Sequence, residues 1–164
     1  FRSPESIFEA RVKEETEKWE AILKMDGTEN AYLLHKELGE WMTDNMTVVR
    51  HNDRLEKTYE KLTELQERWN NINVNDTQRW SNQGAHFVRQ LKNMLYLAKV
   101  MTKGALLRNE SRGAHYKPEF PDRDDENFLK TTMAKFDPAT GEPIITYQEV
   151  DVSLIPPRKR DYSA

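Results

Sequence analysis

The amino-acid sequence predicts a mainly helical protein, in which a three- to four-helix bundle is followed by a loop, a small β-hairpin and an extended C-terminal tail. Over the first two thirds of the chain, apolar residues recur at steps of three and four, the spacing of helices that bury one face. The last third instead holds two segments rich in β-branched and aromatic residues around a turn sequence. We expect the bundle at residues 1–109, the loop at 110–129, and the hairpin and tail at 130–164, all in one structural domain.

The first helix is predicted to begin at Ser3 and Pro4, where a hydroxyl can cap the helix and proline fixes φ at the first helical position. Asp26 and Gly27 are predicted to end it. Its apolar stripe should face the core and consists of Phe8, Val12, Trp19, Ile22 and Leu23.

Two further helices follow the first. One is predicted to begin near Glu29, with an inward face made of Ala31, Leu34, Leu38, Trp41 and Met42. Asn52 or Asp53 can cap the next helix. Its stripe is Leu55, Tyr59, Leu62, Leu65 or Gln66, Trp69 and Ile72, and the polar segment 70–76 forms the connection after it.

The fourth helix, at about residues 77–109, is predicted to be the longest. Its bundle-facing seam comprises Gly84, Phe87, Leu91, Met94, Ala98, Met101 and Ala105. The later half carries a second apolar face, made of Leu97, Val100, Gly104 and Leu107. Because the bundle can cover only one of these faces, we expect something else to cover the other.

The C-terminal third is predicted to form a hairpin. Residues 130–136 and 143–152 are the two strands, and the sequence DPATG at 137–141 is the turn between them. The prolines at 156 and 157 cannot continue a helix or a central strand, so the basic segment after them should be extended.

Composition excludes several classes of function. The chain has 164 residues, a formal net charge of −3 and no cysteine. It therefore has no disulfide, no thiolate nucleophile and no cysteine-ligated iron–sulfur cluster, and its charge gives no reason to expect a nucleic-acid partner. No apolar run approaches the ~20 residues that span a bilayer. Residues 1–6 do not resemble a signal peptide, and we expect the chain to be part of a longer protein.

No catalytic or metal-binding pattern emerges from the chain. The four histidines show no H-x-x-x-H spacing, and we expect His35 and His86 to lie at helix surfaces. There is no G-x-S-x-G, no phosphate-binding loop and no G-x-G-x-x-G, so nothing indicates dinucleotide binding here. The carboxylates at 122–126 lack the order of a calcium-binding EF-hand loop and are better explained as the start of a helical turn near Asn127.

The segment 110–116, ESRGAHY, is the most unusual stretch and has two interpretations. In a catalytic one, Arg112 binds a carboxylate and His115 moves a proton. In a structural one, the segment ends the long helix, with Gly113 in a left-handed conformation and Arg112 paired to an acid. The residues alone favour the structural interpretation.

Three motifs carry a resemblance to a known family: ESRGAH at 110–115, FPDRDD at 120–125 and NFLK at 127–130. Together with TMA at 132–134, the strand around Tyr147, and the PP and RDY sequences at 156–157 and 160–162, they resemble the C-terminal region of succinate dehydrogenase and fumarate reductase flavoproteins. The similarity runs from about residue 108 to 162. The earlier helices, with Trp41 and VVR at 48–50, are compatible with the family but less diagnostic.

The resemblance implies an up-and-down, loosely spectrin-like bundle that packs on the FAD-binding domain of the same subunit and lies near the iron–sulfur subunit. Membrane anchor subunits would be reached only indirectly, on the cytoplasmic side of a bacterial membrane. The parent enzyme interconverts succinate and fumarate, passing hydride to flavin N5 and electrons on to quinone. The FAD and substrate motifs of the family belong upstream, so we expect this chain to bind no FAD, to hold no catalytic residue and to be inactive alone.

If the chain belongs to this family, the second apolar face of the fourth helix and the loop that follows form its docking surface. Gly104 would allow close backbone approach, and Arg112 and Arg123 would form charge pairs at the rim. The full set is Leu97, Val100, Gly104, Leu107, Glu110, Ser111, Arg112, Gly113, His115 and Arg123.

Other interpretations remain open. L-aspartate oxidase and adenylylsulfate reductase share a related helical C-terminal domain, although the hairpin and the closing PPRKRDY at 156–162 favour the succinate and fumarate enzymes. A stand-alone helical interaction module would suit the charged, tryptophan-bearing helices but leaves residues 110–162 unexplained. A metal-dependent hydrolase is disfavoured because no histidine joins the acidic loop at a usable spacing.

Overall fold

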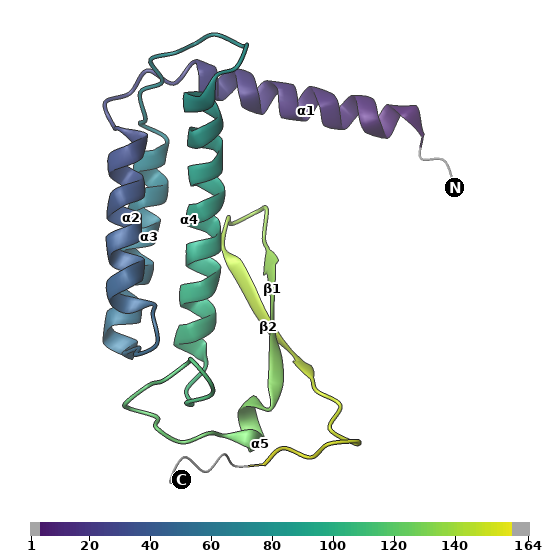
Figure 1. The fold of residues 1–164 in the computed structure, drawn as a ribbon. Helices are drawn as coiled ribbons and strands as arrows, with labels where there is room; N and C mark the ends of the chain where they lie inside the picture. The colour runs from purple at the N-terminus through teal and green to yellow at the C-terminus, as the bar shows by residue number, and fades with distance from the viewer. Residues whose placement is uncertain (1–3, 159–164) are drawn as a thin grey trace.

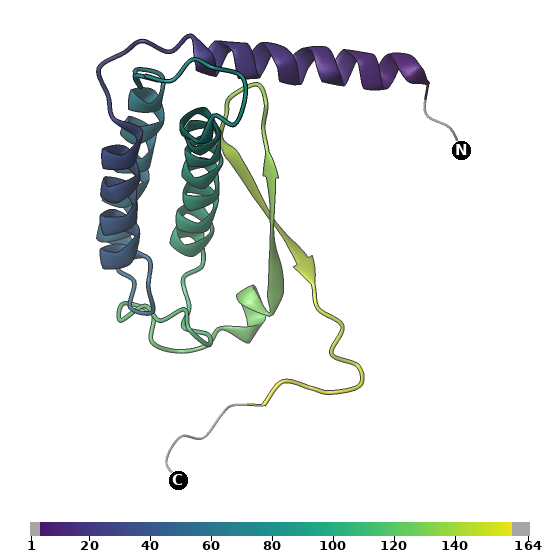
Figure 2. The same cartoon turned by 45° about the horizontal axis from the view of Figure 1, so that its top comes forward.

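The computed structural model describes residues 4–158 and shows a three-helix bundle with a hairpin on its side (Figure 1). The elements, in chain order, are α1 (Glu5–Leu23), α2 (Ala31–Asn45), α3 (Asn52–Trp69), α4 (Gln83–Leu107), α5 (Asp125–Phe128), β1 (Lys130–Phe136) and β2 (Pro143–Glu149). Helices α2, α3 and α4 lie side by side, and the hairpin packs on α4 (Figure 2). The predicted fold class, a helical bundle followed by a small hairpin, is confirmed.

Helix α1 projects from the bundle as an arm (Figure 1). Only its last residues, Ile22 and Leu23, are buried, whereas Phe8 and Val12 are 61% and 65% exposed. The prediction that both of these face the core is therefore wrong, because the helix leaves the bundle before it reaches them. Pro4 precedes the helix rather than opening it, and Ser3 lies outside the described residues.

The chain enters α2 and α3 in different ways. Asn30 caps α2, and its side-chain oxygen accepts hydrogen bonds from the backbone N–H groups of Tyr32 and Leu33. Neither Asn52 nor Asp53 caps α3 as predicted, because His51 holds the cap position without a side-chain bond. The Asn52 amide instead donates to Asn109 Oδ1 at 3.1 Å, at the far end of α4.

The fourth helix is shorter than predicted, because Asn82 caps it by accepting from the N–H of Ala85 at 2.8 Å. Leu91, Ala98 and Ala105 of the predicted seam are buried, but Met101 is exposed. The seam is displaced by about one residue, so that Val88 and Leu95 are buried as well. The main core joins side chains of all four long helices: Ile22, Leu23, Leu34, Leu38, Leu62, Leu65, Trp69, Val88, Leu91 and Leu95.

The two connections at the top of the bundle pair with each other through their backbones. The N–H of Gly27 donates to the carbonyl of Ile72, and that of Glu29 to the carbonyl of Asn71, at 3.2 and 2.8 Å. A Cβ on Gly27 would lie 2.0 Å from the Asn71 carbonyl oxygen. Only glycine permits this approach. Helix α1 has already ended at Leu23, so Gly27 does not stop the helix as predicted but allows the two connections to pair.

Strands β1 and β2 are antiparallel, with Lys130 opposite Glu149 and Phe136 opposite Pro143. The predicted turn is confirmed: Gly141 has φ +72° and donates to the carbonyl of Asp137 at 2.8 Å. The second strand ends at Glu149, three residues earlier than expected. Part of the predicted extended tail, residues 159–164, lies outside the described residues.

The turn of the hairpin is fixed to the bundle by an ion pair between a buried lysine and a partly exposed glutamate. The Glu142 carboxylate accepts hydrogen bonds from the Lys99 ammonium and the Tyr59 hydroxyl, and Lys99 is almost fully buried. Burial opposes the ionisation of Glu142, but these two bonds outweigh it and lower the pKa of its carboxyl. The hairpin thus covers a side of α4 that the bundle leaves open. No helix within residues 4–158 combines the length and apolar character needed to cross a bilayer.

Candidate functional site

The loop after α4 forms a polar junction that joins the end of the bundle to α5 and β1 (Figure 1). At its centre Glu110 is fully buried. Its carboxylate accepts hydrogen bonds from Nε and Nη2 of Arg112, at 2.9 and 3.0 Å, and from the backbone N–H of Asp124, at 2.9 Å. Arg108 donates to the same carboxylate. Burial raises the pKa of Glu110, but these donors outweigh it, so the net pKa is lowered and the buried carboxylate is ionised.

The two arginines predicted to pair at the rim of a docking surface form their ion pairs inside the chain. Asp125 accepts from Nη2 of Arg112 and from Nη2 of Arg123, each at 2.7 Å. The neighbouring Asp124 caps α5 by accepting from the N–H of Asn127 at 3.0 Å. The acidic run therefore begins a helical turn, as predicted, and Arg112 is paired to acids, as the structural interpretation requires.

Arg108 fixes the end of α4 to the start of the hairpin. Its guanidinium donates to the carbonyls of Phe128 and Lys130, at 2.9 and 2.8 Å, and to Thr132 Oγ1 at 3.0 Å. Sequence reasoning placed Arg108 only at the edge of the family resemblance. Its role depends on partners 20 to 24 residues away, which no local pattern reveals.

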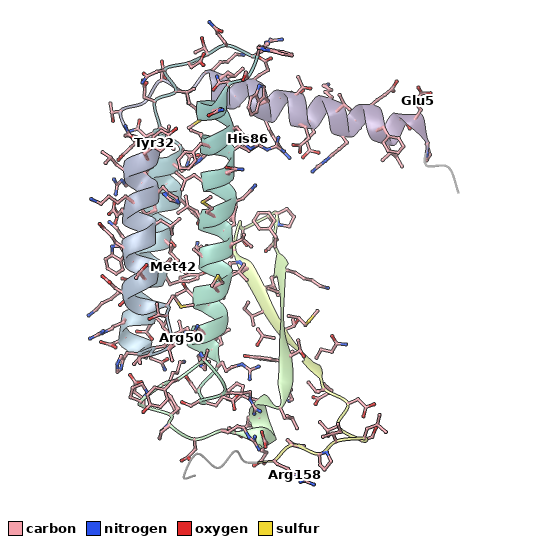
Figure 3. The ribbon with its side chains drawn as sticks, in the orientation of Figure 1. Glu5, Tyr32, Met42, Arg50, His86 and Arg158 are labelled. Atoms are coloured by element: carbon pink, nitrogen blue, oxygen red, sulfur yellow. The ribbon has the colours of Figure 1, made fainter. Side chains whose placement is uncertain are left out.

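His115 is held between the bundle and the loop. Nη1 of Arg50, which lies at the lower end of the bundle in Figure 3, is 2.7 Å from His115 Nδ1, and His115 Nε2 is 2.9 Å from the carbonyl oxygen of Arg108. A guanidinium only donates, so Nδ1 accepts and Nε2–H donates, which makes the imidazole neutral. Burial lowers the pKa of His115 accordingly. With both nitrogens engaged by structural partners, the ring is poorly placed to move a proton.

Gly113 adopts the predicted left-handed conformation, with φ +59°, but it does not end α4. It lies in a tight turn closed by two backbone hydrogen bonds between Arg112 and His115, at 2.8 and 3.0 Å. The helix has already ended at Leu107. Ser111 pins the turn to the rest of the loop, because its hydroxyl donates to the carbonyl of Phe120 at 2.7 Å.

Lys117 is a fully buried cation that sequence reasoning did not single out. Its ammonium donates to the carbonyl of Leu106 and to Asn109 Oδ1, both at 3.0 Å. Burial lowers its pKa to about 8. The side chain satisfies a carbonyl at the C-terminal end of α4, which favours cations, and so it serves the fold rather than catalysis.

The apolar residues proposed for docking are divided by the hairpin. Leu97 and Leu107 are 62% and 46% exposed, whereas Val100 and Gly104 are half-buried. A Cβ on Gly104 would lie 3.7 Å from Thr132 Cγ2, so β1 approaches α4 there. The chain's own hairpin covers this part of the second face. Leu97, Met101 and Leu107 remain exposed on α4.

One cluster of possible metal ligands was not foreseen. One ligand atom each of His51, Asp53 and Glu119 lies within 4.8 Å of the others. His51 Nδ1 and Glu119 Oε1 are 3.0 Å apart and hydrogen-bond to each other. This bond ties the loop to the start of α3, which accounts for the pair without a metal. His35 and His86 are exposed on their helices, as predicted.

Comparison with known proteins places this junction in a family. Residues 35–162 match a family model described as the C-terminal region of fumarate reductase flavoproteins. The chain belongs to the succinate dehydrogenase and fumarate reductase flavoprotein family. It is 66% identical over 158 residues to the succinate dehydrogenase flavoprotein subunit of Bacillus subtilis, a match that covers 96% of this chain and 27% of that subunit.

Solved structures agree with the family assignment. A structure of Escherichia coli quinol fumarate reductase superposes with a TM-score of 0.91 at 32% identity, over 97% of this chain and 27% of the other. The fumarate reductase flavoprotein subunit of E. coli K12 is 34% identical over 96% of this chain and 26% of its own length. The chain thus spans about a quarter of these relatives and corresponds to their C-terminal domain. The family resemblance predicted from the sequence is confirmed.

Proposed function

We propose that this chain is the docking domain through which a succinate dehydrogenase or fumarate reductase flavoprotein subunit completes its FAD-binding body and faces the iron–sulfur subunit. The parent enzyme would interconvert succinate and fumarate, with FAD as hydride acceptor and quinone as electron acceptor or donor. Membrane anchor subunits would hold the complex on the cytoplasmic side of a bacterial membrane, with this domain peripheral. The division into a bundle at 1–109, a junction loop at 110–129, and a hairpin and tail at 130–164 belongs to the same proposal.

The observation that carries this proposal is a set of exposed apolar residues on α4, here called the apolar strip, beside a polar junction whose charged groups pair with one another. Leu97, Met101 and Leu107 remain open on α4 although the hairpin covers its neighbouring side. The side chains of Glu110, Arg112 and His115 are engaged in hydrogen bonds within the chain. We therefore assign the loop a structural role and no catalytic one. Apolar area flanked by ion pairs is typical of an interface core with a polar rim.

FAD itself does not fit the residues of this chain. A dinucleotide site needs a glycine-rich turn between a parallel strand and a helix. The strands among residues 4–158 form an antiparallel hairpin, and the sequence has no G-x-G-x-x-G. We therefore place FAD, the dicarboxylate site and every catalytic residue in the remainder of the subunit. The chain alone is expected to be inactive.

Replacing Leu107 with Asp in the whole subunit tests the docking face. The variant should assemble poorly with its partners, because the new carboxylate must lose its water at an apolar interface. Leu33→Asp is the matched control, because Leu33 is an exposed leucine on a different helix, α2. The proposal is wrong at this residue if both variants assemble equally, or if Leu107→Asp also lowers the helical content of the chain.

A further inference from the structure

A groove lies between the arm formed by α1 and the bundle. It has a volume of about 690 Å³ and takes its walls from α1, the end of α3, α4 and the last residue of β1. Figures 1 and 3 show α1 leaving the top of α4, with the hairpin tip further along α4. Its apolar and aromatic lining comprises Ile22, Met25, Trp69, Tyr96 and Phe136. This lining suits an apolar or aromatic part of a polypeptide segment.

Lys92 is the basic side chain of the groove that lacks an acidic partner. Its ammonium lies 4.3 Å from the centroid of the Trp69 ring, and no carboxylate in the described part of the chain reaches ion-pair distance. The other basic residues of the lining already have partners: Arg11 and Lys18 pair with Glu14 and Glu15, and Arg89 pairs with Glu15.

The positive charge of Lys92 is therefore not balanced by an acidic side chain in the groove. Burial lowers the pKa of Lys92, and the neighbouring charge of Lys18 adds to the effect. The face of the Trp69 ring attracts the ammonium but accepts no strong hydrogen bond. A carboxylate entering from outside would supply a charge-assisted hydrogen bond and restore the balance of charge.

The apolar surface continues from the groove along the arm. A neighbouring hollow shares Arg11 and Glu15 with the groove and adds Val12 and Trp19. Val12 is a large apolar residue exposed on an arm that stands clear of the bundle, and Phe8 lies one turn before it. A partner that enters the groove would therefore cover the arm as well.

The length of the relatives indicates where that partner comes from. The match covers only 27% of the B. subtilis subunit, and the family model describes a C-terminal region. Most of the relatives' chain therefore lies outside the matched part, before it in sequence. In those relatives, the residues before the matched part adjoin the segment that corresponds to the arm, and they are the nearest source of such a partner.

We propose that a carboxylate-bearing segment of the same flavoprotein subunit, from the part outside this chain, lies in the α1–α4 groove and forms an ion pair with Lys92. This inference rests on the proposed function and adds a second contact, separate from the apolar strip at Leu97 and Leu107. The apolar strip would contribute buried apolar area to docking, whereas the groove would select a segment whose carboxylate pairs with Lys92.

Zero-length carbodiimide cross-linking of the intact subunit in its complex, followed by peptide mass spectrometry, tests this pairing. Lys92 should form an amide with an Asp or Glu outside these 164 residues. The cross-link should disappear in Lys92→Arg, because a guanidinium keeps the charge but forms no such amide. Lys13, on the same arm with a side chain 80% exposed, serves as the control for unspecific coupling.

Several outcomes would overturn the inference. They are a cross-link from Lys92 to Glu14 or Glu15 only, a cross-link to another subunit, or free labelling of Lys92 by an acylating reagent at the rate of Lys13. The Leu107→Asp assembly experiment is independent of this readout. If assembly fails in that variant while wild-type Lys92 stays unlinked, the groove inference alone is wrong. If Lys92 is linked but Leu107→Asp assembles normally, the apolar docking strip is wrong.

Discussion

Glu110 and Arg112 form a two-pronged ion pair just beyond the end of α4, with Nε and Nη2 of the arginine 2.9 and 3.0 Å from the two carboxylate oxygens. The carboxylate is fully buried and also takes a backbone hydrogen bond from Asp124. Arg112, to which the catalytic interpretation of the sequence gave a role, thus joins the bundle to the hairpin together with Glu110.

Replacing Glu110 with Gln should destabilise the chain by about 3 kcal/mol, because it leaves the guanidinium groups of Arg108 and Arg112 beside a buried site without its negative charge. Denaturant unfolding measures the change. Glu126→Gln, at an exposed position on α5, should have little effect. Equal losses in the two variants would mean that the ion pair contributes nothing beyond surface electrostatics.

The stability of the chain should decrease as the pH falls from about 8 to 5. The pKa of His115 is lowered by burial, so the unfolded chain takes up a proton near the ordinary value of 6.5 while the folded chain does not. The contribution of His115 is therefore complete above that value and is lost progressively below it.

His115→Gln should flatten this part of the pH profile, because the side chain no longer titrates. The comparison is between the two unfolding free energies at each pH, so the other three histidines cancel. An identical slope in wild type and variant would show that His115 takes up its proton equally in the folded and unfolded chains.

Replacing Glu142 with Ala should release the hairpin turn from α3 and α4 without unfolding the bundle. The change removes the acceptor shared by Lys99 and Tyr59. Hydrogen exchange should become faster at the amides of β1 and β2 and stay unchanged in α2. Glu149→Ala, at the other end of the hairpin where the ion pair with Lys130 is long at 3.5 Å, is the control. Unchanged exchange in the hairpin would contradict this account of how the turn is held.

Elements set by local chemistry could be predicted from the sequence. The limits of β1 and the turn at Gly141 follow from β-branched strands around a sequence that needs a positive φ. The helical segments follow from apolar periodicity. The seam of α4 was displaced because this helix is apolar on several sides, so periodicity alone could not choose between Phe87 and Val88 as the buried residue.

Features that depend on distant contacts could not be predicted in the same way. The exposure of Phe8 and Val12 depends on the direction in which α1 leaves the bundle. The spacing of apolar residues along a helix does not predict that direction. Lys99 is charged and yet buried, because a turn 43 residues later brings Glu142 to it. The family resemblance drew attention to the segment after α4, but the partners of this segment, from Arg50 to Thr132, were visible only in the fold.

The most direct test of the central claim mixes this chain with its matching flavin-binding body, truncated before the residue that corresponds to Phe1. Complex formation and succinate-dependent dye reduction are measured together. The docking-domain account predicts tight binding and recovery of activity that neither piece has alone. Absence of binding, with normal activity in the truncated body, would contradict it and would make this chain an interaction module for some other partner.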